Sequence, residues 1–434
     1  GHLRARVLAG LPYRPTTAQS RAVDEIAQDM ASPQRMNRLL QGDVGSGKTL
    51  VALMALLTAV EAGGQGVMMA PTEILARQHL EGLRPLAESA GVVLEILTGR
   101  DKGSERAAKL AALAAGKIQI LVGTHAVFQK DVVFDDLRLA VIDEQHRFGV
   151  SQRMELGAKG QAADVLVMTA TPIPRTLAMT FYGDLDVSII DELPPGRKPI
   201  QTIHRFESHR PQLYQFMREQ IGLGRQIYIV YPLIEESETL DFKSLEDGYL
   251  NITEAFPIPE YQVSMVHGKM RPEDKDREMQ RFIEGTTHIM VATTVIEVGV
   301  NVPNASVMII ENAERFGLSQ LHQLRGRVGR GAEQSYCILM SADQISEDAK
   351  LRLHTMTQTN DGFALSEVDL KLRGPGDLMG TQQSGVLQLK IADLTKDQEL
   401  LSLARKEAMR ILHADPTLSQ TEHLVLKKAF EAVL

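Results

Sequence analysis

The residues from Gly42 to Thr49 have the types and spacing of a loop that binds nucleotide phosphates. They read Gly-Asp-Val-Gly-Ser-Gly-Lys-Thr, between a short apolar strand and an apolar helix. Glycines let backbone N–H groups curl around phosphate oxygens, and the positive end of the following helix points at the same place. We therefore expect Lys48 to reach the β- and γ-phosphates and Thr49 to reach Mg²⁺, with the other nucleotide contacts from Gly42, Asp43, Val44, Gly45, Ser46 and Gly47. The alternative is a chance match in a glycine-rich turn, which the flanking elements disfavour.

Two carboxylates, Asp143 and Glu144, follow the apolar run 139–142. A buried strand delivers such residues to its C-terminal edge, where ligands bind in open α/β sheets. We expect Asp143 to hold Mg²⁺, directly or through water, and Glu144 to polarise the attacking water as a general base. The alternative is an ordinary acidic turn, and the phosphate loop upstream favours the catalytic interpretation.

The run Gln-Leu-Arg-Gly-Arg-Val-Gly-Arg at 323–330 places arginines at fixed spacing. A planar guanidinium stabilises charge on a transferring phosphoryl group, so this run is typical of the second half of a split active site. Arg327 and Arg330 are the catalytic candidates, and a basic surface loop is the alternative.

The 12 histidines show no metal-ligand spacing, so Mg²⁺ is the metal we expect.

The composition is that of a soluble globular protein of two or three domains. The chain has 434 residues, of which 44% are hydrophobic and 24% charged. No apolar run approaches the ~18 residues of a membrane span, the single cysteine excludes an intrachain disulfide framework, and the N-terminus lacks the apolar core of a secretory signal. We therefore expect a cytoplasmic protein with no membrane partner. The net charge of −8 disfavours a protein that coats nucleic acid through general basicity.

Two blocks of short β-branched runs alternate with helical segments, which predicts two α/β domains with parallel sheets. The strands expected in the first block are 37–41, 65–70, 118–122, 137–142 and 165–169, with helices at 50–62 and 73–90. Those of the second block are 226–231, 262–266, 288–292, 306–310 and 336–340, with helices at 272–284 and 320–324. The proline-rich run 192–199 breaks both kinds of element and marks the domain boundary.

Strands are expected to stop near residue 342, and a mainly helical segment follows. Its helices are predicted at 343–360 and 391–413, with a glycine-rich turn at 372–377 between them. The resulting division is 1–195 for the first α/β domain, 196–345 for the second, and 346–434 for a helical hairpin and C-terminal tail.

The box Asp-Glu-Gln-His at 143–146 resembles that of the superfamily-2 helicases and translocases. In that superfamily Arg327 and Arg330 match the arginine fingers, and Gln19 matches a glutamine that senses adenine. Thr169 and Thr171 match a motif that couples ATP state to the nucleic-acid site. Gly299 and Asn301 match a further nucleotide motif, although Asn301 stands where Asp is more usual. Plainer alternatives are ordinary turn chemistry for the threonines and, for Gln19, an exposed residue after a helix N-cap.

The motifs at 42–49, 143–149 and 169–176 together resemble the RecG family of branch-migration helicases. Three stretches favour RecG over the transcription-repair coupling factor: 230–237, Ser46, and 360–363 leading to 372–377. The resemblance implies two tandem RecA-like P-loop domains and a translocation motif, with ATP and Mg²⁺ as cofactors. It implies a double-stranded DNA translocase that regresses forks and branch-migrates Holliday junctions. The implied partners are branched or duplex DNA and a single-stranded-DNA-binding protein, and the implied state is a monomer.

The resemblance also implies positions that contact DNA or couple hydrolysis to movement. Those in the translocation motif are Arg352, Arg373 and Gln383. Candidates on the first domain are Thr72, Arg100 and Thr124, because each puts a polar group near a strand end or a helix start. Helix caps and turn-filling side chains are the alternatives for all six.

Three other functions are weighed against this one. The first is the motor of a coupling factor that displaces RNA polymerase. The second is a P-loop switch or GTPase, which predicts an Asn-Lys-x-Asp motif that the sequence lacks. The third is a non-catalytic DNA-binding scaffold, which the intact catalytic set disfavours. Because motor signals begin at about Leu11, we expect the motor portion of a RecG protein without its N-terminal wedge domain.

Overall fold

The computed structural model describes residues 1–144, 163–170, 173, 185–233, 238–293, 301–331, 333–378 and 397–431. These residues form two compact units. The first unit holds two parallel sheets with their helices and ends at Ser366, and the second holds the helical residues from Glu367 onward. No helix in these ranges is both long and apolar enough to span a membrane.

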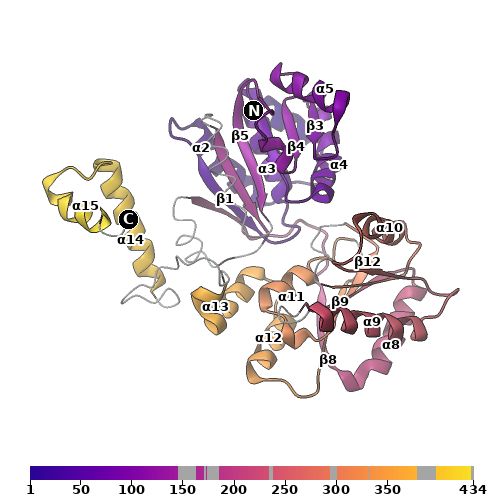
Figure 1. Cartoon of the computed structure of the whole chain (residues 1–434). Helices are drawn as coiled ribbons and strands as arrows, with labels where there is room; N and C mark the ends of the chain where they lie inside the picture. Colours follow the sequence, from indigo (N-terminus) through magenta and orange to yellow (C-terminus); the bar gives the residue numbers. More distant parts are fainter. Residues whose placement is uncertain are drawn as a thin grey trace. The chain divides into compact units, whose positions relative to one another are not determined.

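The first sheet has seven strands in the order β3-β4-β2-β5-β6-β1-β7, and all neighbouring strands in it are parallel. Its strands are β1 (Asn37–Gly42), β2 (Gln65–Met69), β3 (Leu94–Leu97), β4 (Ile120–Gly123), β5 (Leu137–Glu144), β6 (Asp164–Thr169) and β7 (Asp186–Ile190). The helices around it are α1 (His2–Gly10), α2 (Thr17–Ala31), α3 (Lys48–Glu61), α4 (Glu73–Ser89) and α5 (Gly103–Ala114), with a 3-10 turn η1 (His125–Phe128). Figure 1 shows α3 and α4 beside the strands that they contact.

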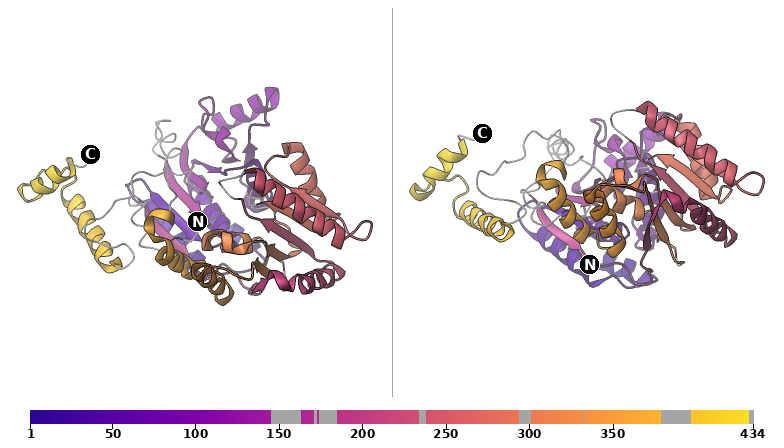
Figure 2. Two further views of the ribbon diagram at one scale, coloured as in Figure 1. Left: turned by 60° about the horizontal axis from the view of Figure 1, so that its bottom comes forward. Right: turned by 90° about the horizontal axis from the view of Figure 1, so that it is seen from below.

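The second sheet has six parallel strands in the order β10-β11-β9-β12-β13-β8. Its strands are β8 (Gln201–Phe206), β9 (Gln226–Tyr231), β10 (Val263–Val266), β11 (Ile289–Thr293), β12 (Ala305–Ile310) and β13 (Tyr336–Ser341). The helices are α8 (Arg210–Gly222), α9 (Glu238–Ala255), α10 (Pro272–Ile283), α11 (Leu318–Arg325) and α12 (Glu347–Gln358), with 3-10 turns η2 (Glu207–His209) and η3 (Ala313–Arg315). The turned views of Figure 2 show helices lying along the strands of both sheets.

The C-terminal helices are α13 (Gly362–Leu378), α14 (Gln398–Ala414), the 3-10 turn η4 (Thr421–His423) and α15 (Leu424–Glu431). Helix α14 leaves Leu400, Leu403 and Met409 more than half exposed.

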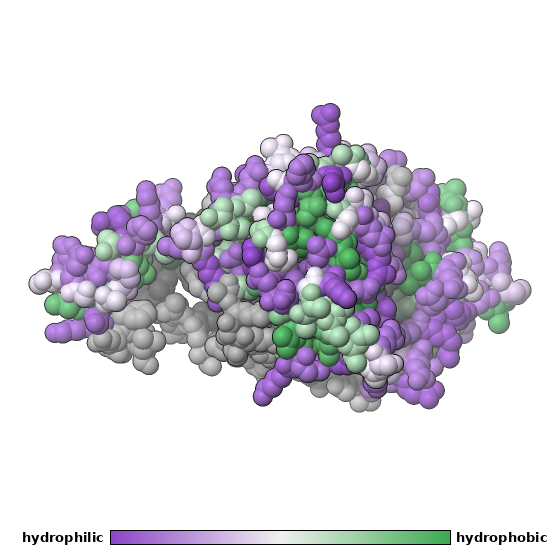
Figure 3. All heavy atoms as spheres, turned by 90° about the horizontal axis from the view of Figure 1, so that it is seen from above, coloured by the Kyte–Doolittle hydropathy of each residue, from purple (hydrophilic) through white to green (hydrophobic). Residues whose placement is uncertain are grey.

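Hydrophilic residues cover most of the face drawn in Figure 3, with hydrophobic residues in separate patches between them. The expected fold class, two parallel-sheet α/β domains and a helical C-terminal segment, is confirmed.

The core of each α/β domain explains why its central strands are easy to recognise. Helix α3 is buried at nearly every position from Leu50 to Val60, and β2 is buried along its whole length. A strand with both faces covered contains a continuous apolar run, and this signal predicts β2, β5, β6 and their counterparts in the second sheet.

Five strands were expected in each sheet, and the missing ones are edge strands. Strands β3 and β7 form the two edges of the first sheet, and β8 forms one edge of the second. Strand β3 has only four residues, and β8 is nowhere fully buried. Because an edge strand is covered less completely, short or polar sequences are tolerated there and the apolar pattern is lost.

The glycine-rich turn expected at 372–377 is wrong, because α13 continues through these residues to Leu378. The helix begins at Gly362. The preceding residue, Asp361, accepts a hydrogen bond from the Phe363 N–H on its carboxylate, at 2.9 Å. Glycine costs about 1 kcal/mol and proline about 3 kcal/mol inside a helix, which is a penalty that an established helix can absorb. By contrast, residues 191–200 contain no helix or strand, so the break expected at 192–199 is confirmed.

Candidate active site

The phosphate loop connects the end of β1 at Gly42 to the start of α3 at Lys48, as the sequence predicts. Gly45 and Gly47 have φ values of +77° and +87°, the left-handed region that favours glycine. A Cβ at Gly47 would lie 1.9 Å from Gln19 Nε2, so this glycine is also required by close packing. The loop is therefore a concave run of backbone at a helix N-terminus, the arrangement that suits phosphate.

The Lys48 ammonium lies folded against this loop. Its Nζ donates to the carbonyl oxygens of Gly42 at 2.7 Å and Asp43 at 3.0 Å. The pKa of Lys48 is lowered to about 8, mainly by burial and also by nearby Arg330, whereas Asp143 and Asp43 oppose the shift. Lys48 is thus a cation in a desolvated position, where an anion would interact with it strongly.

Gln19 is held by the loop and by its own helix. Its Nε2 donates to the carbonyl oxygens of Ser46 at 3.2 Å and Gly47 at 3.3 Å, and its Oε1 accepts from the Thr16 N–H at 2.8 Å. Thr16 Oγ1 in turn accepts from the Gln19 N–H, which completes a capping box for α2. The expected N-cap is therefore present, but Gln19 is buried and not exposed.

Two polar atoms in this region fit an oxygen-rich ligand. The Ser46 hydroxyl and Arg330 Nε are buried and have no hydrogen-bond partner among the described residues. Such groups are rarely left unsatisfied, so each is suited to a ligand oxygen. Together with the curled loop and Lys48, they fit a nucleotide polyphosphate.

Asp143 lies at the end of β5 and is held by a histidine of α4. Its Oδ2 is 2.7 Å from His79 Nε2, and both side chains are mostly buried. Asp143 is also close enough to Lys48 to influence the pKa of that ammonium. Glu144 ends the same strand, and its side chain lies outside the described residues.

The second α/β domain reaches the phosphate loop through α11. The Asp43 carboxylate lies 2.6 Å from His322 Nε2 and also accepts from the Val44 N–H at 2.8 Å. Although burial alone would raise the pKa of Asp43, the contact with His322 lowers it overall. Asp43, expected to line the phosphates, therefore directs its carboxylate at the other domain.

A buried arginine fixes the orientation of His322. Arg325 Nη2 lies 3.1 Å from His322 Nδ1, and because arginine is only a donor, Nδ1 accepts and Nε2 carries the proton that faces Asp43. Arg325 Nη1 also donates to Met356 O on α12 at 2.8 Å and to Thr202 Oγ1 on β8 at 3.2 Å. This chain of contacts joins the phosphate loop to α12.

One cleft of about 1450 Å³ brings together most of the expected catalytic residues. The members expected from the sequence are Gln19, Val44, Gly45, Gly47, Lys48, Thr49, Arg100, Asp143, Asn301, Arg327 and Arg330. Burial lowers the pKa of Arg330, and so does nearby Arg197. A cleft with these cations and Asp143 on its walls has the charge distribution of a site for a nucleotide and its metal ion.

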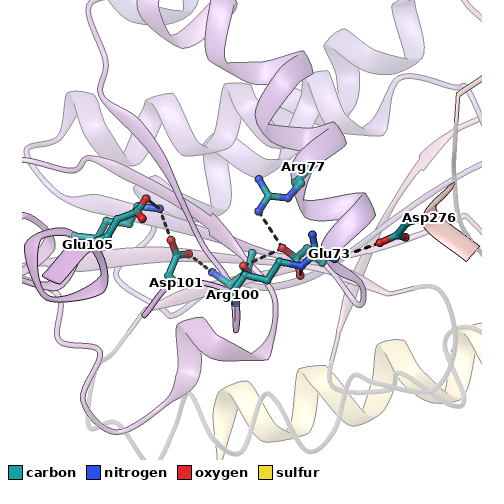
Figure 4. Close-up of polar contacts among 8 residues, drawn as sticks. Glu73, Arg77, Arg100, Asp101, Glu105 and Asp276 are labelled. Atoms are coloured by element: carbon teal, nitrogen blue, oxygen red, sulfur yellow. Dashed lines mark hydrogen bonds and ion pairs between the residues drawn. The ribbon is translucent and has the colours of Figure 1, made fainter. Parts of the chain in front are cut away.

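The residues expected to contact DNA are occupied by protein partners. Thr72 Oγ1 caps α4 by accepting from the Leu75 N–H at 3.3 Å. Arg100 Nε lies 3.1 Å from Glu73 Oε2, and Arg100 Nη2 lies 3.4 Å from Asp276 Oδ2 on α10 (Figure 4). The helix-cap alternative is therefore realised for Thr72, and Arg100 takes part in a carboxylate network.

The other expected coupling residues are distributed over both domains. Thr124 precedes η1, and Thr169 is buried at the end of β6. Arg352 Nη2 donates to Glu314 O at 2.7 Å. Arg373 lies on α13, but its side chain is outside the described part of the structure. Thr171, Gly299 and Gln383 lie wholly outside the described residues.

Four residues that the structure places at or near the cleft were missed from the sequence: His79, Arg197, His322 and Arg325. The sequence does carry a signal for His322 and Arg325, because the two residues are three positions apart on a helix and so share a face. For His79 and Arg197 the sequence carries none, because their partners are far away along the chain.

Three family models match successive parts of the chain. They are the DEAD/DEAH box helicase at 16–180, the helicase conserved C-terminal domain at 210–332, and "ATP-dependent DNA helicase RecG, domain 3, C-terminal" at 359–433. Two curated relatives are named ATP-dependent DNA helicase RecG and are both 52% identical. The match to the Synechocystis protein covers 96% of this chain and 50% of the relative, and the match to the Bacillus subtilis protein covers 97% and 62%. This chain belongs to the RecG family.

A solved structure of a RecG protein bound to a three-way DNA junction has the same fold. It superimposes with a TM-score of 0.76 at 46% identity, over 92% of this chain and 51% of the other. The chain thus spans between half and two thirds of the RecG proteins that it matches. Its two parallel-sheet α/β domains match the fold of that RecG structure.

Proposed function

We propose that this chain is an ATP-hydrolysing motor that translocates on duplex DNA and acts on branched DNA. The observation that carries the proposal is the single cleft with the phosphate loop and Asp143 from one α/β domain and Arg327 and Arg330 from the other. A site divided between two domains changes with nucleotide state, which is the property that a translocating motor needs. The DNA junction bound by the RecG relative supports branched DNA as the substrate.

In this proposal each catalytic group acts on the γ-phosphate or on the attacking water. Glu144 accepts a proton from the water as its oxygen attacks the γ-phosphorus, and the bond to the β-phosphate oxygen breaks. Lys48, Arg327 and Arg330 stabilise the negative charge that develops on the phosphate oxygens. Closure of the domains in the presence of ATP places the arginines, and loss of phosphate releases them.

Thr49 and Asp143 would hold Mg²⁺, which supplies positive charge at the phosphates. Both residues line the cleft, and their oxygen ligands suit this ion. Among the described residues there is no cluster of three or more His, Cys, Asp or Glu that could hold a metal ion. We therefore expect Mg²⁺ to bind together with the nucleotide, whose phosphates complete its ligands.

The more specific roles follow from the family. They are fork regression and Holliday junction branch migration in DNA repair and recombination, a single-stranded-DNA-binding protein as partner, and a monomeric state. Gln383→Ala should leave most ATPase activity and reduce movement on DNA. The alternative is a coupling-factor motor acting on RNA polymerase, which the match of the C-terminal helices to a RecG domain disfavours.

The deciding experiment is steady-state ATP hydrolysis without DNA, with linear duplex and with a model fork. Lys48→Ala should abolish hydrolysis, and Glu144→Gln should retain bound ATP while hydrolysing it at least about a hundredfold more slowly. Stimulation by DNA supports the motor, and preference for the fork supports action on branched DNA. Hydrolysis that persists in Lys48→Ala, or that no DNA stimulates, contradicts the proposal for this chain.

A further inference from the structure

An arginine from the segment that joins the two sheets lies against the phosphate loop. Arg197 belongs to residues 191–200, between β7 and β8. A Cβ added at Gly45 would be only 1.9 Å from Arg197 Nη1 and 2.8 Å from its Cζ. The guanidinium therefore occupies the space that a side chain at position 45 would fill. Gly45 is thus needed for this approach as well as for its own left-handed backbone.

The Arg197 guanidinium has no protein partner in the part of the chain that the structure describes. No hydrogen bond or ion pair holds it, whereas Arg210 and Arg38 each pair with two carboxylates. Burial lowers the pKa of Arg197, and nearby Tyr13 opposes this. An arginine with no carboxylate beside it, on the wall of a cleft, is suited to an anionic ligand.

Three cations converge on this part of the cleft. Lys48, Arg197 and Arg330 all line the same cleft, and Arg197 lies close enough to Arg330 to lower the pKa of that guanidinium. Cations that line the same desolvated cleft repel one another unless an anion lies between them. Arg330 Nε is also buried there without a hydrogen-bond partner among the described residues. A linear polyphosphate supplies several anionic oxygens to one site and satisfies all of these groups together.

We propose that Arg197 is a phosphate-binding residue of the nucleotide site, contributed by the segment that joins the two α/β domains. This inference rests on the proposed ATP-dependent function and adds a third arginine to Arg327 and Arg330. Because Arg197 lies between β7 and β8, its contact with phosphate ties the connecting segment itself to the presence of nucleotide.

The test compares Arg197→Ala, Arg197→Gln and Arg197→Lys with the neighbouring control Lys198→Ala. Equilibrium binding of ATP, ADP and adenosine is measured by calorimetry or by displacement of a fluorescent nucleotide. We expect Arg197→Ala and Arg197→Gln to weaken ATP and ADP binding about tenfold or more and to leave adenosine binding unchanged. Arg197→Lys should recover part of the loss, because the charge remains but the planar fork is gone. The control should match the unmodified chain.

Three results separate the possible failures. ATP binding by Arg197→Gln within twofold of Lys198→Ala overturns the inference and leaves the proposed function intact. An equal loss of ATP and adenosine binding also overturns it, because the residue would then act through the fold or the base site. If the unmodified chain binds no ATP, or if Lys48→Ala binds it equally well, the proposed function itself fails.

Discussion

Asp143 illustrates how one side chain is prepared for its proposed chemistry by a residue from another element. Asp143 is the next-to-last residue of β5, and His79 of α4 lies 2.7 Å from its Oδ2. A hydrogen bond to one carboxylate oxygen fixes the plane of the group and leaves its other oxygen for Mg²⁺. Outer partners of this kind commonly affect metal binding as much as the ligands themselves.

His79→Ala should therefore raise the Mg²⁺ concentration needed for half-maximal ATPase activity by about tenfold to a hundredfold. The measurement is a Mg²⁺ titration of hydrolysis together with metal-free ADP binding, which should not change. His79→Gln, which keeps a donor, should recover part of the loss, and the exposed His354→Ala serves as the control. A His79→Ala chain with wild-type Mg²⁺ dependence would show that the contact has no role in positioning Asp143.

At the scale of elements, α11 is the part that connects the phosphate loop to the rest of the second domain. His322 faces Asp43, and Arg325, one turn later, reaches β8 and α12. Arg325 is 1% exposed, which places a full charge inside the protein. Such a residue is tolerated because its donors are satisfied, and removing it leaves a cavity and acceptors without donors.

Arg325→Ala should lower the free energy of unfolding by about 2–4 kcal/mol. Thermal and urea unfolding, followed by circular dichroism, measure this loss, with the exposed Arg315→Ala as the control. Nucleotide binding should weaken as well, because His322 loses the partner that fixes its proton on the side of Asp43. Equal stability of the two variants would mean that the Arg325 contacts contribute nothing net.

The same elements show why the sequence predicts some features and not others. The phosphate loop was predictable because its residues are consecutive and because a short strand precedes it and a continuously apolar helix follows it. Edge strands β3, β7 and β8 were not, since β3 has only four residues and β7 and β8 are incompletely buried. His79 and Arg197 could not be found either, because 64 residues separate His79 from Asp143, and Arg197 meets Gly45 only after the chain has folded. Local order is encoded locally, whereas contacts between elements depend on the whole packing.

At the scale of the whole molecule, one charge network spans both α/β domains through Arg100, a residue expected from the sequence to contact DNA. Glu73, on α4, accepts from Arg77 at 2.9 Å and pairs with Arg100, which also meets Asp276 on α10 (Figure 4). The side chains of Arg100 and Asp276 are 65% and 51% exposed, so water screens their attraction. A DNA phosphate could therefore replace either carboxylate at small cost, and Arg100 would exchange an internal partner for the substrate.

This exchange predicts effects of opposite sign for the two partners. Arg100→Ala should raise the concentration of duplex DNA that gives half-maximal ATPase stimulation, and Asp276→Ala should lower it, each by no more than about fivefold because exposed pairs contribute at most about 1 kcal/mol. Hydrolysis without DNA should stay the same in both variants, and higher salt should reduce the difference between them. The control is Arg138→Ala, which removes an exposed arginine paired with Asp136. If Arg100→Ala and Asp276→Ala shift the DNA dependence in the same direction, the pair serves only to hold the domains together and does not compete with DNA.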